Sequence, residues 1–404
     1  MKRLALAALA LLSSAIAPAA PLKIATWNIG WHLDAELAAT WMAACSQPFA
    51  LQGETWKPVA AAGDGTRPGW QLPWGRNAPV EWDIGKLPPC DIYQAPRPGE
   101  TQRTVVPVSE AQWAQRVARM GSLVRDRLQP DVIAFQEVSG EKAIRELLGK
   151  HWEVCSYEGH KVQRLAIAWK ASLGPGHCEV HWPLSLPERP LREQVRPGLA
   201  LTLQVDGKPL TVMTLHLKSS CVSPLDDQSR TPGRGRLDSD EPNCRHLQEQ
   251  VKPLEAWIEA QAAKSEAFVL LGDFNRNLTH EANEAADAPV RQGERTRNLW
   301  RELNDGSPVL QLLGPQCEGD MEGVCSLAKQ RLLDGRAYGR LRGELGCRNP
   351  IGLDHVVIGA ALASPSGAYK KSLGRAGETR WLPDGGAELG LSDHCPVMAT
   401  IERR

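Results

Sequence analysis

The chain has 404 residues, enough for one large domain or two ordinary ones, and 42% of them are hydrophobic, which is sufficient for a sizeable core. Its 47 basic residues balance its 47 acidic residues, so the formal net charge is zero. This balance excludes recruitment of a polyanion by an overall positive field, and any nucleic-acid binding has to come from local patches.

The N-terminus is typical of a secretory signal peptide covering residues 1–20. Lys2 and Arg3 precede an apolar run from Leu4 to Leu12, and small residues follow. The run is too short for a membrane anchor, and no later stretch reaches membrane-spanning length. We therefore expect an exported protein, secreted or periplasmic, without stable membrane insertion.

Ten cysteines, an even number, agree with an oxidising destination. No CxxC pair or zinc-type spacing occurs, which favours disulfides over a metal–thiolate site. Loop geometry suggests three pairs, Cys45–Cys90, Cys155–Cys178 and Cys221–Cys244. The other four cysteines would then pair among themselves, although the sequence does not fix the connectivity.

The first predicted strand, Leu22 to Trp27, delivers Asn28 at its end. From about residue 32 to 108 neither the helical nor the strand period persists, which indicates an irregular insertion. Its tryptophans are expected to form a small core of their own, with base stacking as the alternative. Ser109 and Gln112 then form a capping box that begins a helix.

A buried strand from Asp131 to Val138 carries Glu137 near its end. A carboxylate in an apolar strand is costly unless it pairs with a basic residue or binds a cation, and both alternatives stay open. After a helix over 141–148 and a strand over 164–169, the turn at Asp206-Gly207 predicts a hairpin. Its second strand places His216 at its exit.

Residues 222–243 have no periodicity and indicate a surface loop. A helix over 247–258 leads to the apolar strand at Phe268, which ends at Asp273 and Asn275. Because side chains alternate along a strand, these two residues point the same way. Residues 280–350 are irregular and become basic, which fits a solvated face or a groove that follows phosphates.

A strand over 353–358 opens with Asp354, and Asp393 and His394 precede the last strand. Together with the residues above, they show that polar side chains follow or precede predicted strands throughout the chain. Separated carboxylates suit Mg²⁺. A histidine polarised by a carboxylate can take a proton from water, and further donors can stabilise the negative charge of a transition state. Phosphodiester hydrolysis needs this combination.

The local motifs resemble one known family: Trp27-Asn28, Gln136-Glu137, His216-Leu-Lys-Ser219, Gly272-Asp-Phe-Asn275, Asp354-His355 and Ser392-Asp-His394. The order and sequences are similar to the endonuclease/exonuclease/phosphatase family, which includes pancreatic DNase I and neutral sphingomyelinases. The resemblance implies an α/β fold, a four-layer α/β sandwich of two packed mixed sheets flanked by helices. It implies one catalytic domain over residues 21–404, with disulfide-stapled insertions near 32–108, 222–243 and 280–350.

The resemblance also implies residue roles. Glu137 would be the main ligand of Mg²⁺, with Mn²⁺ and Ca²⁺ as alternatives, assisted by Asn28 and Asp393. His394, oriented by Asp354, would act as general base or phosphate ligand. Asp273 would position or deprotonate the attacking water, and Asn275 would bind the phosphate. His216 would contact the phosphate or protonate the leaving group. Arg164, Lys218 and Arg276 would bind the substrate.

One departure bears on His216. DNase-like members pair the corresponding histidine with a glutamate near the start of the middle strand, and here Gln163-Arg164 occupies that place. A phosphate contact therefore suits His216 better than acid catalysis.

The Lys-Ser after His216 resembles secreted bacterial nucleases of the family, and arginines gather in 189–196 and 331–348. We therefore expect a metal-dependent nuclease acting on DNA, RNA or both. The alternatives are a phospholipase C- or sphingomyelinase-type enzyme, a small-molecule phosphodiesterase, or a non-catalytic binding module on the same fold. No protein partner can be inferred.

Overall fold

The computed structural model describes residues 21–75, 79–224, 235–284, 291–293, 295–317 and 321–404. The expected signal peptide lies outside these residues. The described helices include none that is long and apolar enough to cross a membrane.

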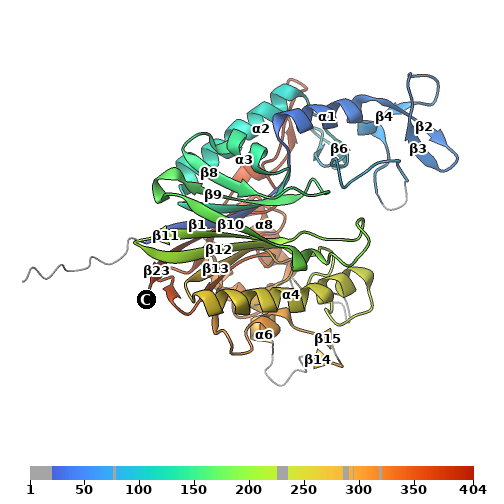
Figure 1. Ribbon diagram of the computed structural model, residues 1–404. Helices are drawn as coiled ribbons and strands as arrows, with labels where there is room; N and C mark the ends of the chain where they lie inside the picture. Colours follow the sequence, from blue (N-terminus) through green and yellow to red (C-terminus); the bar gives the residue numbers. More distant parts are fainter. Residues whose placement is uncertain (1–20, 76–78, 225–234, 285–290, 294, 318–320) are drawn as a thin grey trace, which may run out of the picture.

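Two β-sheets form the centre of the molecule (Figure 1). The first sheet has, in spatial order, β17 (Pro315–Cys317), β20 (Ala368–Lys370), β23 (Val397–Arg403), β1 (Leu22–His32), β7 (Val132–Val138), β9 (Arg164–Lys170) and β8 (Trp152–Ser156), and β19 (Leu362–Ala363) pairs with β23. The second has the order β10 (Gly176–His181), β11 (Gly198–Val205), β12 (Lys208–His216), β13 (Phe268–Asp273), β18 (Asp354–Gly359) and β16 (Leu310–Leu313).

Both sheets are mixed, because β1–β7 and β12–β13 are parallel pairs whereas their outer neighbours are antiparallel. The central strands are apolar on both faces, as expected for strands covered on both sides. One core cluster lies between the sheets and includes Ile24, Val132, Leu201 and Leu271.

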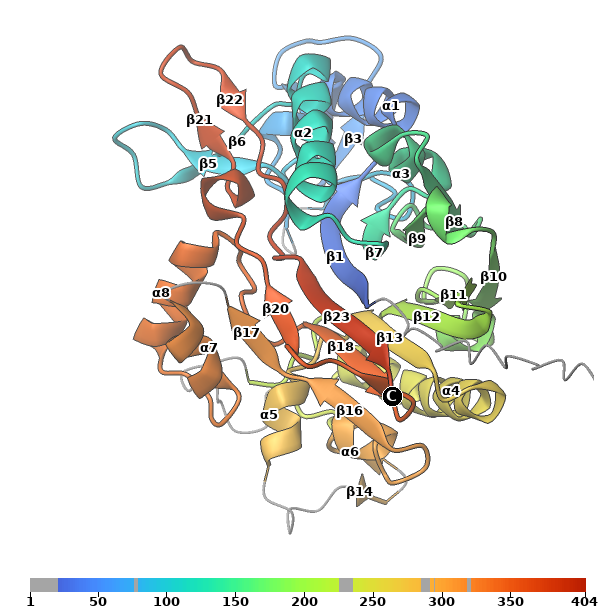
Figure 2. The same ribbon diagram turned by 90° about the vertical axis from the view of Figure 1, so that its left-hand side faces the viewer.

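Helices cover the outer faces (Figures 1 and 2). The first sheet packs against α2 (Glu110–Ser122) with its continuation Leu123–Leu128, α3 (Glu141–Leu148), α7 (Glu322–Ala328) and α8 (Gly335–Leu345). The second packs against α4 (Pro242–Lys264), α5 (Leu278–Asn283) and α6 (Leu299–Leu303). The fold is therefore the expected four-layer α/β sandwich.

The expected disulfides Cys45–Cys90, Cys155–Cys178 and Cys221–Cys244 are confirmed. The remaining four cysteines form Cys317–Cys325 and Cys347–Cys395. All ten cysteines are paired, which agrees with an oxidising environment.

The prediction that residues 32–108 are irregular was wrong in part. They contain α1 (Ala35–Ser46), a small sheet of β2 (Pro48–Gln52), β3 (Thr55–Pro58) and β4 (Arg67–Pro68), and the pair β5 (Gln94–Pro96) and β6 (Arg103–Val105). The Asp34 carboxylate accepts from the Leu37 N–H and caps α1. Trp41 and Trp70 are buried, which confirms the expected packing core for these two residues.

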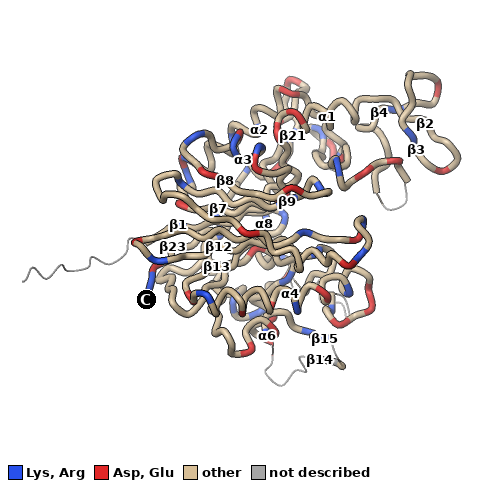
Figure 3. The backbone as a smooth tube through the Cα atoms, viewed as in Figure 1, with Lys and Arg blue, Asp and Glu red and all other residues tan. Residues whose placement is uncertain are grey.

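Residues 280–350 were also predicted to be irregular, yet they supply β16, β17, α7 and α8. Apolar residues recur too rarely in this polar stretch to show a clear helical or strand period, so these elements were not predicted. The remaining short elements are β14 (Arg291–Gln292), β15 (Arg295–Thr296), β21 (Arg380–Trp381), β22 (Ala387–Glu388) and 3₁₀ turns at 69–71, 171–173, 182–185 and 374–377. In Figure 3 acidic and basic residues are interspersed over the chain.

Candidate active site

Asn28 and Glu137 of the first sheet enter the site where strand pairing is irregular, in the β1–β7 pair and the β7–β9 pair respectively. The register shifts between Asn28 and His32 on β1, and β7 shifts against β9 between Gln136 and Val138. Glu137 lies in the β7 shift with a left-handed φ of 61°, an unusual conformation for a residue other than glycine. Such bulges redirect side chains, and here one brings a carboxylate out of an apolar strand.

Three residues of the second sheet form a row across neighbouring strands. His216, at the end of β12, pairs in register with Asp273 at the end of β13, and Asp273 pairs in register with Asp354 at the start of β18. All three side chains are buried. Strand pairing therefore brings together groups that lie far apart in the sequence.

Oδ2 of Asp273 is the centre of the cluster. Asn28 Nδ2 donates to it over 3.0 Å and also lies 3.4 Å from Glu137 Oε1. The Nε2 atoms of His216 and His394 lie 3.4 and 3.9 Å from the same Asp273 oxygen. The two sheets thus contribute to one compact group of carboxylates, imidazoles and an amide.

His394 is held from several directions. Its Nδ1 lies 2.9 Å from Asp354 Oδ2, and its backbone N–H donates to Ser392 Oγ. Ser392 in turn donates to the Asn28 carbonyl, and the Trp27 indole donates to the His394 carbonyl. These bonds fix the imidazole with Nε2 toward Asp273.

Asp354 also receives Lys370, whose Nζ lies 3.3 Å from Oδ2 in a fully buried ion pair. Burial alone would raise the pKa of Asp354, but His394 and Lys370 lower it to about 2. Burial likewise opposes the charge on His394, yet the neighbouring carboxylates, Asp354 first, raise its pKa to about 10. Burial and then Asp354 raise the pKa of Asp273 to about 7, against the opposing effect of His394.

The cluster fits a divalent cation. Glu137 and Asp273 offer carboxylate oxygens on either side of the Asn28 amide, and hard cations prefer such ligands. Asp354 Oδ1 is buried and has no hydrogen-bond partner among the described residues. The ligand atoms of Asp273, Asp354 and His394 also lie close enough to hold one ion, but Asp354 and His394 already bond each other.

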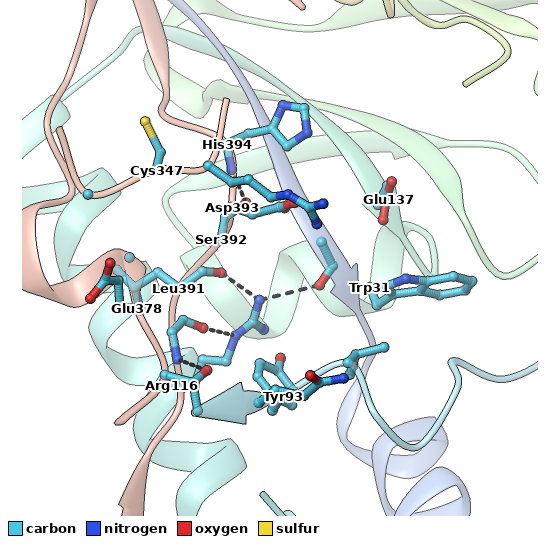
Figure 4. Close-up of a pocket in the computed structure, with 18 of the residues that line it drawn as sticks. Trp31, Tyr93, Arg116, Glu137, Cys347, Glu378, Leu391, Ser392, Asp393 and His394 are labelled. Carbon is cyan, nitrogen blue, oxygen red and sulfur yellow. Dashed lines mark hydrogen bonds between the residues drawn. The ribbon is translucent and has the colours of Figure 1, made fainter. Parts of the chain in front are cut away.

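The site opens into a cavity of about 720 Å³ (Figure 4). Glu137 and His394 line it, together with Asp393, whose side chain is exposed. The other walls come from the end of β1, the insertion around β5 and β6, the last turn of α8 with the segment after it, and the segments flanking the β21–β22 hairpin. They are represented by Trp31, Asp91, Tyr93, Gln94, Arg103, Arg342, Arg348, Glu378 and Thr379.

A family model described as the Endonuclease/Exonuclease/phosphatase family matches residues 82–394. The chain belongs to this family. Its description names endonucleases, exonucleases and phosphatases, and the expected family assignment is confirmed. A search of curated proteins finds no match.

Solved structures of family proteins are similar at low identity. A family protein from Bacteroides thetaiotaomicron is 12% identical with a TM-score of 0.44, covering 95% of this chain and 98% of that one. The 3′-5′ exonuclease NExo from Neisseria meningitidis is 17% identical (TM-score 0.40; 70% and 95% covered). The human Nocturnin catalytic domain is 13% identical (TM-score 0.40; 69% and 82%). The assignment rests on the family match, not on these structures.

Asn275 and Arg276, which follow Asp273, both make hydrogen bonds within the protein itself. Asn275, at φ 52°, donates its amide to the Leu217 carbonyl, so this amide N–H fixes the turn after β13. Arg276 is buried, pairs with Glu281 at 2.6 Å, and donates to the backbone around the Cys221 disulfide. We therefore leave Arg276 out of the substrate-binding set, because its guanidinium has no access to the cavity.

Arg164 is also used internally, since it donates to the carbonyls of Lys161, Ser139 and Gly159 and thereby closes a loop. It does not line the cavity that holds Glu137 and His394. Lys218 is half-buried just beyond His216. Burial, followed by the nearby cations Arg196 and Lys161, lowers the pKa of Lys218 to about 8.

The structure adds residues that sequence reasoning did not assign to the site. Arg196 lies 2.7 Å from His216, and Lys370 lies against Asp354. Trp31 lines the cavity beside the family motif at Asn28. Only Arg196 stood out in the sequence, as one of several arginines in 189–196, and nothing there linked it to His216.

Proposed function

We propose that this protein is an exported, divalent-metal-dependent phosphodiesterase, and specifically a nuclease acting on DNA, RNA or both. The observation that carries the proposal is the placement of Asp273 Oδ2 among Asn28, His216 and His394, beside Glu137 and an arginine-lined cavity. Paired disulfides support export, and residues 21–404 would form one catalytic domain.

Glu137, Asn28 and Asp393 would hold the cation, with Asp273 close by. When bound, a cation such as Mg²⁺ neutralises charge on a phosphate and lowers the pKa of water. The carboxylate-rich set suits Mg²⁺ or Mn²⁺ better than a thiophilic metal, since every cysteine is in a disulfide.

The protein's own groups would perform the remaining work. Asp273 would position the attacking water and accept its proton. His394, held by Asp354, would present Nε2 to a phosphate oxygen, and Asn349, 3.4 Å from that nitrogen, stands beside it. His216 would contact the phosphate from the other sheet.

Arg342 and Arg348 in the cavity wall would contact the phosphodiester chain. The Cys347–Cys395 disulfide ties their segment to the residue after His394, and the Arg348 N–H donates to the Asp393 carbonyl over 2.7 Å. The basic wall is thus anchored to the site itself.

The test is cleavage of supercoiled plasmid by the disulfide-intact mature protein in Mg²⁺ or Mn²⁺, compared with EDTA. His394→Ala should abolish nicking, whereas His177→Ala, on the exposed face of the edge strand β10, should not. Metal-dependent cleavage that disappears in the first variant only is the expected result. Intact plasmid with every metal contradicts DNA cleavage, and RNA and choline phospholipids would then be assayed.

A further inference from the structure

We propose that the cavity beside the active site is a subsite for one unpaired nucleotide, whose base stacks on Trp31. This inference rests on the proposed nuclease function and names the form of its substrate: single-stranded nucleic acid, or a strand whose base has left the helix. Trp31 is unusual in both its backbone and its surroundings.

Trp31 has a left-handed φ of 51°, which costs free energy for a bulky side chain. Backbone strain of this kind persists where the surrounding structure enforces it, and it concentrates at ligand sites. Here Arg116 fixes the chain just before Trp31, because its buried guanidinium donates to the carbonyls of Ile29 and Leu391, and its Nε to that of Gly390. The end of β1 is thereby locked to the opposite wall.

The Trp31 indole differs from the insertion tryptophans. Trp41, Trp74 and Trp82 donate their N–H groups to backbone carbonyls within the insertion core. Trp31 packs against that core while remaining only partly buried, and its indole N–H has no acceptor among the described residues. The ring thus lines the cavity on a fixed support.

Figure 4 shows Trp31 and Glu137 on the same side of the cavity, with Glu378 and Cys347 across from them. The volume of about 720 Å³ falls within the range of roughly 300–1,000 Å³ typical of small-molecule sites, so a nucleotide fits. Asp91, Gln94 and Thr379 supply polar groups for a base edge, and Arg342 and Arg348 supply charges for phosphates.

Side-chain contacts hold the walls of the cavity together. The Trp381 indole on β21 donates to the Ala95 carbonyl on β5, and Arg97 lies 4.6 Å from the centre of the Trp381 ring. The insertion and the C-terminal hairpin therefore form one connected wall. In a duplex both faces of an internal base are covered by its neighbours, so a base can stack on Trp31 only when it is unpaired or terminal.

The experiment measures kcat/KM on single-stranded oligonucleotides in which one residue is abasic, placed in turn at each position around the scissile phosphate. Base–aromatic stacking supports a loss of about 5- to 150-fold at one position. Trp31→Ala should lose the same factor on the unmodified strand and nothing further on the abasic one. Trp31→Phe should retain most activity, and Trp182→Ala, 49% exposed elsewhere, should match wild type.

Each outcome decides between the two proposals. Equal rates with and without the base, or an equal loss for Trp31→Ala on both strands, overturn the subsite while leaving the nuclease intact. Faster cleavage of an internal duplex site than of the single strand overturns it too. If the wild-type protein cleaves no oligonucleotide, its binding to a labelled single strand is measured by fluorescence anisotropy in EDTA. Binding that Trp31→Ala weakens supports the subsite but not the nuclease. Absence of binding overturns both proposals.

Discussion

His216 Nε2 lies 2.7 Å from a guanidinium nitrogen of Arg196. A guanidinium only donates, so His216 must accept through Nε2 and is neutral, with its proton on Nδ1. Burial, and then Arg196, lower the pKa of His216 well below its usual value. The arginine thus disfavours acid catalysis by His216.

Replacement of Arg196 tests its role directly. Arg196→Gln removes a positive charge that faces Glu137 and Asp273, and should lower kcat by about 10²- to 10³-fold, as loss of one fixed transition-state donor does. Steady-state kinetics on plasmid measure this effect, with the 87% exposed Arg192 changed to Gln as the matched control. Equal rates for the two variants would show that Arg196 only supports His216 structurally.

The Lys370–Asp354 pair should be essential for stability. Lys370→Met leaves Asp354 buried without one of its two cationic partners, and breaking a buried pair on one side costs about 3–5 kcal/mol. Urea denaturation measures the free energy of unfolding. Adding Asp354→Asn to Lys370→Met should recover part of the loss, and a single variant as stable as wild type would contradict the assignment.

The Cys347–Cys395 disulfide should support both stability and activity. It spans 48 residues and joins the arginine-bearing segment to the residue after His394, so its replacement by alanines should cost about 2–4 kcal/mol and slow cleavage. The 8-residue Cys317–Cys325 bridge is the control, since a short loop stabilises less and its cysteines do not line the cavity. Larger effects from the control pair would refute this ranking.

His32 should make the fold sensitive to acid. Burial and Arg116 lower its pKa to about 3, below the unfolded value near 6.5, so the unfolded chain binds more protons than the folded one. This contribution to stability is present above about pH 6.5 and is lost as the pH falls toward 3. Unfolding free energies of wild type and His32→Gln, compared between pH 7 and 4, should converge as the pH falls; parallel curves would exclude the effect.

The sequence predicted which residues end strands, because apolar runs are visible and polar residues interrupt them. His216, Asp273 and Asp354 were identified in this way, but strand register, which sets them in one row, depends on long-range pairing. Arg276 shows the opposite limit. It follows a site motif and yet is buried, because its guanidinium is satisfied by Glu281 and by the carbonyls of Cys221 and Gly235, the latter two distant in sequence. Helix α1 was missed although Asp34 is a typical N-cap.

The central claim is tested most directly by the rate of plasmid cleavage by Asp273→Asn at saturating Mg²⁺. The amide keeps the size of the side chain and its contact with the Asn275 N–H, but it cannot accept a proton from water. Loss of a general base typically costs about 10²- to 10⁴-fold, and we expect a decrease in this range with an unchanged melting temperature. A variant that cleaves within about twofold of wild type would contradict the proposed site.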